Sequence, residues 1–321
     1  MQELEKKLIS KACELLDNGT VQRVLGWKKG DFCYDPSPAV FNSKDELKDF
    51  VYNGFCGANL SKYLVKESKK EGKILVFLKP CDTYSFNQLK KEHRINADNI
   101  YPIGIECQGK YDVYKINLQG VEFINDFKED LETLTVNGDK KFNRDDVKLE
   151  KCLVCNKKHV AGVEFIVDHE KAPAKLDRFA MVKRLEAMTA DQRYAFFKEQ
   201  LSKCIRCNAC RNVCPACTCT QCVFDNPKSG IDSKANSTSF EEKLYHIIRS
   251  FHVAGRCTDC GECSRVCPQH IPLHLINRKY ISDIDKFYGE YQAGEDDNSR
   301  GPLTDFNKGD IDPSQIFGGK K

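Results

Sequence analysis

Two runs of cysteines share one spacing in the last third of this 321-residue chain: CIRCNACRNVCP at residues 204–215 and CTDCGECSRVCP at residues 257–268. In both runs the cysteines are separated by two, two and three residues, and a proline follows the fourth cysteine. Gaps of two residues let one short loop present three thiolates to the same centre, so each run predicts a metal-binding loop. A spacing that occurs twice in one chain is a specific signal.

The spacing C-x2-C-x2-C-x3-C-P is the one with which bacterial ferredoxins hold four-iron clusters, and there the fourth cysteine of each run binds the other cluster. It predicts two interlocked [4Fe-4S] clusters with the ligand sets Cys204, Cys207, Cys210 and Cys267, and Cys257, Cys260, Cys263 and Cys214. Zinc held by pairs of cysteines is the alternative, but it explains neither the third and fourth cysteines nor the prolines. We therefore expect iron-sulfur clusters.

The composition argues against several other classes of protein. Eighteen cysteines would indicate a disulfide scaffold in a short secreted protein, but this chain is long, rich in lysine and carries no predicted secretion signal. The formal net charge is only +3, and no long block of one sign occurs, so a nucleic-acid partner is not expected. No apolar run approaches the length of about 18 residues that spans a membrane. We expect a cytoplasmic protein without a membrane span.

Residues 1–175 are predicted to form an α/β domain with a mainly parallel sheet. Helical patterns alternate with short apolar runs, of which KILVFL at residues 73–78 is typical of a strand buried on both faces. This alternation predicts parallel strands with helices outside the sheet. The predicted helices are 3–16, 60–70 and 82–91, and the predicted strands are 21–25, 73–78, 100–105, 113–116 and 163–167.

Residues 176–288 are predicted to form a second, mostly helical domain around the two cysteine runs. Thr189 and Gln192 predict a reciprocal cap at the start of a helix that leads into the first run. A later helix carries an apolar stripe, Leu244, Ile247, Ile248 and Phe251, and ends at Gly255. Residues 289–321 are rich in Gly, Asp, Asn and Lys, and we expect a polar tail that is either disordered or docked on a partner.

The second domain resembles the α-helical ferredoxin domain. A predicted helix precedes each cysteine run, about forty residues separate the runs, and the chain leaves the second run through CPQHIPL at residues 267–273. In these features it is similar to the small iron-sulfur subunit of heterodisulfide reductases, to anaerobic glycerol-3-phosphate dehydrogenase and to succinate dehydrogenase. The resemblance covers about residues 185–288. It implies an α-helical ferredoxin domain with two [4Fe-4S] clusters.

A third group of cysteines follows the predicted strands of the first domain. Cys81 comes shortly after the strand 73–78, Cys107 follows the next strand, and Cys152 and Cys155 form a C-x2-C pair further on. The carboxyl ends of parallel strands meet at one edge of a sheet, where ligands bind. These four cysteines therefore predict a third cluster. Buried free thiols together with a separate zinc site at the C-x2-C pair are the alternative.

Residues 5–170 resemble the beta subunits of deazaflavin-reducing hydrogenases and formate dehydrogenases, through the Pro80-Cys81 loop, the strand end GIEC at 104–107 and the late C-x2-C pair. The resemblance implies that Cys81, Cys107, Cys152 and Cys155 hold a cluster beside FAD. The predicted flavin contacts are Asn53, Gly54, Gly57, Asn59 and Lys79. Glycine lets backbone amides approach a phosphate or the flavin ring, although glycines in an ordinary turn look the same.

Cys217, Cys219 and Cys222 are needed by neither run. With a fourth ligand, from Cys33, Cys56 or a partner, they would form a zinc site or hold an additional cluster. The alternative is that they are packed thiols that line a cluster and tune its reduction potential.

The preferred interpretation is an electron-transferring subunit of a larger oxidoreductase. The chain has no dinucleotide fingerprint, phosphate loop or nucleophile elbow, so cofactors are expected to supply the chemistry. A flavin would exchange hydride with NAD(P)H or an 8-hydroxy-5-deazaflavin, and clusters would pass single electrons to partner subunits.

The expected partners are hydrogenase, formate dehydrogenase, heterodisulfide-reductase-like or NADH-dehydrogenase-like subunits, and electron-bifurcating complexes fit this description. A second interpretation omits the flavin and makes the chain an electron wire whose first domain is a docking scaffold. A third, a zinc-dependent nucleic-acid or adaptor protein, is disfavoured because no basic stripe occurs and both runs end in Cys-Pro.

Overall fold

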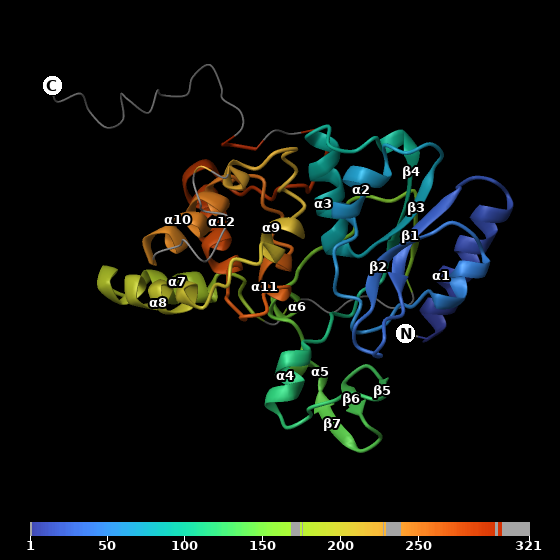
Figure 1. Ribbon diagram of the computed structural model, residues 1–321, viewed down its shortest axis with the longest axis horizontal. Helices are drawn as coiled ribbons and strands as arrows, with labels where there is room; N and C mark the ends of the chain where they lie inside the picture. The colour runs from blue at the N-terminus through green and yellow to red at the C-terminus, as the bar shows by residue number, and fades with distance from the viewer. Residues whose placement is uncertain are drawn as a thin grey trace.

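The computed structural model describes residues 2–167, 174, 176–226, 228, 239–298 and 301–303. An α/β part, coloured blue to green, lies beside a helical part, coloured yellow to red (Figure 1). The boundary that we predicted at residue 175 falls outside the described residues. Among the described helices, none has both the length and the apolar composition of a membrane span.

The α/β part is built on a five-stranded sheet in the order β2-β1-β3-β4-β8. Its strands are β1 (Arg23–Lys28), β2 (Ser37–Phe41), β3 (Ile74–Leu78), β4 (Ile100–Ile105) and β8 (Glu164–Ile166). Neighbouring strands from β1 through β3 and β4 to β8 pair in parallel, whereas β2 pairs antiparallel with β1. The sheet is therefore mixed but mostly parallel. Every residue of β3 is buried, as its continuous apolar run predicted.

Helices cover both faces of this sheet. α1 (Gln2–Asp17) lies on one face, and α2 (Ser61–Glu67) and α3 (Pro80–Lys91) lie on the other (Figure 1). α3 begins where β3 ends, and Pro80 is suited to its first turn because the first amides of a helix have no intrahelical partner. Two 3₁₀ helices, η1 (Asp45–Asp49) and η2 (Ala97–Asn99), complete the connections. The β3-α3 junction places Cys81 at the carboxyl edge of the sheet.

A small subdomain, absent from the sequence prediction, follows β4. It contains a three-stranded antiparallel sheet of β5 (Phe127–Glu129), β6 (Thr133–Val136) and β7 (Lys140–Asn143), with α4 (Val113–Leu118) and α5 (Arg144–Val147) packed around its own apolar core. The strand that we predicted over 113–116 is wrong. Those residues form α4 because the side chain of Asp112 accepts a hydrogen bond from the amide of Tyr114 and caps a helix. The short helix α6 (Glu150–Leu153) then leads back to the main sheet.

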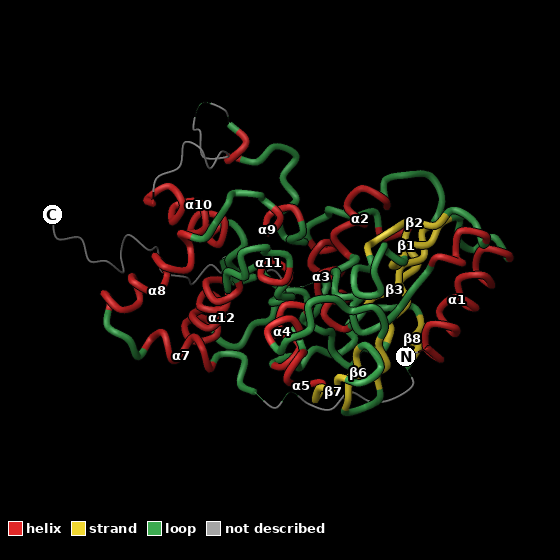
Figure 2. Tube along the Cα trace, turned by 60° about the horizontal axis from the view of Figure 1, so that its bottom comes forward, coloured by secondary structure: helices red, strands yellow, loops and turns green. Residues whose placement is uncertain are grey.

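The helical part consists of α7 (Ala180–Glu186), α8 (Ala190–Ser202), α9 (Ala209–Asn212), η3 (Val223–Asp225), α10 (Ser239–Phe251), α11 (Glu262–Arg265) and α12 (His274–Tyr288). The reciprocal cap of Thr189 and Gln192 at the start of α8 is confirmed. The short helices α9 and α11 belong to the cysteine runs. Figures 1 and 2 both place them between α10 and α12 on one side and α3 on the other.

α10 does not turn its apolar stripe fully into the interior. Of the apolar stripe, Ile247 is 39% exposed and Phe251 is 57% exposed. The buried positions are instead occupied by polar side chains, notably His246, Arg249 and Ser250. The interior against which α10 packs is therefore polar.

The first described residues of the expected tail pack on their own chain. Asp297 pairs with Lys90 of α3, and Gln292 accepts a hydrogen bond of 3.0 Å from Arg178. Gly294 lies so close to the carbonyl oxygen of Tyr84 that a side chain at this position would overlap it. Residues 289–298 thus form a strap across α3, and residues 304–321 lie outside the described part of the chain.

Candidate functional site

The two cysteine runs fold into loops with the same backbone shape. Arg206 and Asn208 in the first run have φ angles of 55° and 60°, and Asp259 and Gly261 at the equivalent positions of the second run have φ angles of 53° and 66°. Such left-handed residues turn the chain tightly enough for its amides to face inward, and the amide of Arg206 donates to Cys204 Sγ over 3.3 Å. Equal spacing in the sequence therefore produces equal geometry.

The structure gathers the first predicted ligand set around one cavity. Cys204, Cys207, Cys210 and Cys267 line this small space together with His246. Burial raises the pKa of Cys210, and the neighbouring thiols of Cys204, Cys267 and Cys207 raise it further. Cys267 belongs to the second run, so the crossing of the fourth cysteine that the sequence predicted places it beside the first three.

The second set shows the reciprocal arrangement. Burial raises the pKa of Cys257, Cys260 and Cys263, and the nearby thiol of Cys214 contributes to the rise in all three. Buried thiols that oppose one another's ionisation need positive charge before they can all become thiolates, and iron supplies that charge. The donor set therefore fits a cluster.

The third group of cysteines lines a cavity of about 200 Å³ at the carboxyl edge of the sheet. Cys81 comes from the first turn of α3, Cys107 follows β4, Cys152 lies on α6, and Cys155 follows that helix. Burial raises the pKa of Cys152 to about 11. The walls also carry six basic side chains, Lys79, Lys110, Lys151, Lys157, Arg178 and Arg278, against the acidic Asp259, Glu290 and Glu295. A net positive wall around four cysteines suits an anionic cluster.

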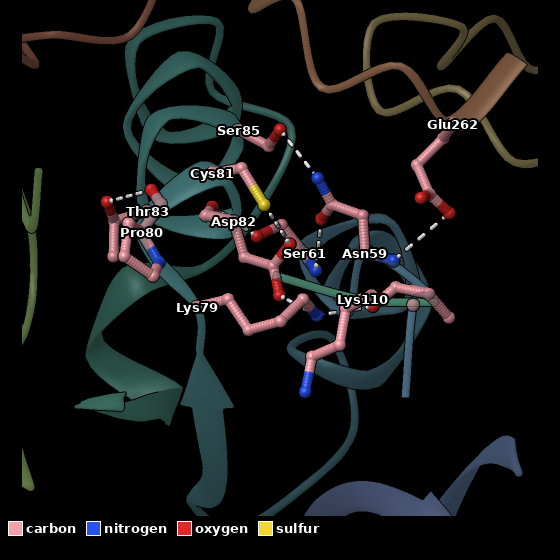
Figure 3. Close-up of polar contacts among 12 residues, drawn as sticks. Asn59, Ser61, Lys79, Pro80, Cys81, Asp82, Thr83, Ser85, Lys110 and Glu262 are labelled. Atoms are coloured by element: carbon pink, nitrogen blue, oxygen red, sulfur yellow. Dashed lines mark hydrogen bonds and ion pairs between the residues drawn. The ribbon is translucent and has the colours of Figure 1, made fainter. Parts of the chain in front are cut away.

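The third cavity also contacts the second cysteine run. Cys260 lines it. The next charged residue of that run, Glu262, is fully buried and forms ion pairs with Lys151 of α6 and, at 2.8 Å, with Arg265. Glu262 also accepts a hydrogen bond of 3.2 Å from the amide of Asn59 (Figure 3). These contacts hold the second run against the edge of the sheet.

The predicted flavin contacts are engaged by protein groups. Lys79 is 1% exposed, donates to the carbonyl oxygen of Ala58 over 2.7 Å and pairs with Asp82 over 2.8 Å (Figure 3). The side chain of Asn59 is fully buried and donates to Ser85 Oγ over 2.9 Å. Lys110 Nζ donates to the carbonyl oxygen of Asn53 over 2.8 Å.

The two glycines of this loop are similarly enclosed. A Cβ at Gly54 would overlap Tyr111, and one at Gly57 would lie 3.0 Å from Cδ of Arg265. Protein groups therefore enclose this loop, and flavin binding at the five residues stays a prediction. A bulky residue at Gly57 would also disturb Arg265 whether or not a flavin binds.

Cys217, Cys219 and Cys222 line another cavity, of about 600 Å³, together with Lys62, Lys66, Arg211, Arg249 and Arg256. Cys33 and Cys56, two of the possible fourth ligands, are not among the residues that line this cavity. Cys33 Sγ donates to the carbonyl oxygen of Ile124 in the small subdomain, and Cys56 Sγ donates to that of Val51.

No three His, Cys, Asp or Glu side chains in the described ranges stand close enough to hold one metal ion. That finding concerns a single ion, whereas a four-iron cluster spreads its cysteines over several iron atoms. The thiols of Cys217 and Cys214 are close enough to shift each other's pKa, which agrees with the alternative that this trio lines a cluster.

Four residues of these sites were missed at the level of sequence: His246, Arg249, Lys151 and Glu262. His246 and Arg249 stand one turn apart on α10, and both face the cysteine cavities. The sequence contained a signal for His246 and Arg249. Both lie on the predicted helix that precedes the second cysteine run, but outside its apolar stripe. Glu262 lies inside the second run, but its buried ion pairs depend on contacts far along the chain.

Comparisons with known proteins agree with this arrangement. Residues 200–271 match the family model of a 4Fe-4S dicluster domain, and this range contains all eight cysteines of the two runs. The chain is 25% identical to F420-dependent formate dehydrogenase subunit beta of Methanocaldococcus jannaschii, with 92% of each chain covered. It is 27% identical to F420-dependent formate dehydrogenase 1 subunit beta of Methanococcus maripaludis, with 89% of each covered.

Among solved structures, the F420-reducing [NiFe] hydrogenase complex from Methanosarcina barkeri contains a matching chain. The TM-score is 0.38 and the sequence identity is 13%. The match covers 48% of this chain and 62% of that chain.

Proposed function

The chain is a homologue of the beta subunits of F420-dependent formate dehydrogenases, and we propose that it is the iron-sulfur electron-transfer subunit of an oxidoreductase complex of that kind. The observation that carries this proposal is the arrangement of the three cysteine sets. The set of Cys81 adjoins the second run through Cys260, and the second run shares interlocked cysteines with the first. The three centres thus form a series.

In this proposal Cys81, Cys107, Cys152 and Cys155 hold one cluster, and the two crossed sets of the dicluster domain hold the others. Clusters of this type accept and release single electrons. The protein positions them and provides positive charge around them. The ion pair of Lys151 and Glu262 joins the edge of the sheet to the second run. It therefore keeps the centre of the Cys81 set at a constant distance from the centre of the second run.

The names of the relatives support the deazaflavin F420, rather than NAD(P)H, as the carrier that the complex uses. NAD(P)H coupling and electron bifurcation stay predictions. A carrier of hydride needs a group that converts pairs of electrons into single electrons. Either a flavin bound to this chain carries out this conversion, or the chain is a wire and the conversion takes place elsewhere in the complex.

Cofactor analysis of the full chain, purified and reconstituted without oxygen, tests the proposal. Three clusters require about twelve irons and as much acid-labile sulfide per chain, whereas the two runs alone require about eight. We expect about twelve irons, and Cys152→Ser should lose about four of them. Cys13→Ser is the matched control, because Cys13 packs against the apolar core of the α/β part.

The outcomes separate the elements of the proposal. A fully loaded chain with about eight irons, unchanged by Cys152→Ser, would remove the third cluster. A chain that binds no iron at all would overturn the electron-transfer function. Flavin measured in the same samples decides between the two interpretations, since one flavin per chain would contradict the wire.

A further inference from the structure

The helix α10 buries a polar face and exposes apolar side chains. Tyr245, His246, Arg249 and Ser250 are each at most 1% exposed, whereas Phe251 is largely exposed. A surface helix ordinarily turns its apolar stripe toward the core. The inward side chains of α10 face cysteine cavities: His246 lines the cavity of the first ligand set, and Arg249 lines the cavity of Cys217, Cys219 and Cys222.

Among these residues, Arg249 carries a buried positive charge without a hydrogen-bond partner among the described residues. Its side chain is 1% exposed, and none of Nε, Nη1 and Nη2 has a hydrogen-bond partner among the described residues. A guanidinium does not escape burial by losing its proton, and a buried charge without a partner is strongly unfavourable. The fold therefore implies negative charge and hydrogen-bond acceptors that the side chains of the described residues do not provide.

The neighbours of Arg249 belong to both predicted clusters. Burial by itself would lower the pKa of Arg249, but the thiolates of Cys263, Cys210 and Cys214 outweigh burial and raise it. Cys210 is in the first ligand set, and Cys263 and Cys214 are in the second. Cysteines of both sets are therefore near enough to act on this guanidinium.

Two other cations around these cavities have carboxylate partners. Arg211 pairs with Asp225 over 2.5 Å, and Arg256 forms an ion pair with Glu92. His246 is buried as well, at 1% exposed, and lines the cavity of the first ligand set. Both ring nitrogens of His246 are also without a partner among the described residues, which is the same sign of acceptors supplied by a bound group.

We propose that Arg249 is a positioning residue shared by the two clusters of the dicluster domain, to whose sulfur atoms its guanidinium donates hydrogen bonds. This inference rests on the cluster assignment proposed above. Reduction adds negative charge to a cluster, so a fixed positive charge in a dry interior stabilises the reduced form. Arg249 therefore raises the reduction potentials of both clusters. Because both rise, the difference between the two potentials stays small, and electrons can pass between the clusters in either direction.

The test is a redox titration of the reconstituted full chain, followed by electron paramagnetic resonance, in which the two clusters are resolved. In Arg249→Gln each cluster's reduction equilibrium should fall at least about tenfold, which is 59 mV for one electron. Arg249→Lys keeps the charge and should retain most of both potentials. Arg193→Gln on α8 is the matched control, because Arg193 donates to backbone carbonyls of Glu186 and Met188 and should shift neither potential.

Each result decides the matter. If Arg249→Gln loads both clusters and leaves either potential unchanged, the shared role is overturned. If Arg249→Gln fails to load, Arg249→Lys decides: two loaded clusters with nearly unchanged potentials support the role of the charge, and failure to load or a large fall overturns it. A wild-type chain without clusters at residues 200–271 would instead refute the proposed function, so the two failures are distinguishable.

Discussion

Glu262 shows at the scale of a residue how one carboxylate can join two parts of a chain. It stands between Cys260 and Cys263, and its side chain contacts Lys151, Arg265 and the amide of Asn59. Burial by itself would raise the pKa of Glu262, but Arg265 and Lys151 lower it to about 2. The carboxylate is therefore charged in the folded chain and is stabilised by two cations, of which the Lys151 side chain is 8% exposed and the Arg265 side chain 25% exposed.

We predict that Glu262→Gln destabilises the chain by roughly 3 kcal/mol at neutral pH, because it leaves the nearly buried ammonium of Lys151 and the partly buried guanidinium of Arg265 without their carboxylate partner. The pKa of Glu262 is depressed on folding from 4.5 to about 2. The wild-type advantage is thus complete above about pH 4.5 and is lost as the pH falls toward 2. Denaturant unfolding of both chains over a pH series measures it.

Asp177→Asn is the control for this prediction. Asp177 pairs with Lys183 at the surface, where such a pair contributes at most about 1 kcal/mol. Equal unfolding free energies for Glu262→Gln and the wild type at pH 7 would show that the buried pairs do not stabilise the fold.

At the scale of an element, the strap of residues 289–298 depends on its close approach to α3. Gly294 has a φ of +78°, and its backbone lies against the carbonyl group of Tyr84. Glycine is required twice, once by the left-handed backbone and once by the lack of space. The strap in turn brings Gln292 and Glu295 to the wall of the Cys81 cavity.

We predict that Gly294→Ala releases the strap, because its Cβ would overlap backbone atoms of α3 in addition to the cost of about 1 kcal/mol for a left-handed alanine. Hydrogen exchange of residues 289–298 should become at least about tenfold faster. Gly289→Ala serves as the control, since Gly289 has a φ of +91° and no atom within 4 Å of its built Cβ. Equal exchange rates in the two variants would show that steric exclusion at Tyr84 is unimportant.

At the scale of the whole molecule, the two cysteine runs interlock. Cys214 closes the first run in the sequence but lies among the thiols of the second in space, and Cys267 does the reverse. Damage to one run is therefore expected to appear at the other run's centre.

We predict that Cys214→Ser disturbs the cluster of Cys257, Cys260 and Cys263 and leaves the cluster of Cys204, Cys207 and Cys210 intact, because a serine oxygen is a poorer ligand for iron than a thiolate. Mössbauer and electron paramagnetic resonance spectra of the two clusters measure this. Cys267→Ser should give the mirror-image result. Spectral changes confined to the cluster of the mutated run would contradict the crossed assignment.

Local patterns determined most of the architecture. Short-range regularities, such as the buried run of β3, the 3.6-residue period of α1 and the capping box of α8, depend on neighbours within a few residues and were therefore predictable. The spacing within the cysteine runs likewise predicted both loops and the 4Fe-4S character of residues 200–271. The small subdomain was missed because its short strands carry too few residues for a clear period.

By itself, the sequence determined that this chain has an α/β part, a helical part and two cysteine runs that form equivalent loops. Only the tertiary structure decided which side of α10 faces inward, where Glu262 finds its cations and that the loop of Asn53 to Asn59 is engaged by protein contacts. The physical reason is that a side chain's partners across long sequence separations depend on the whole packing arrangement. Arg249 illustrates this. Its charged side chain is buried, and the cysteines that raise its pKa come from distant parts of the sequence.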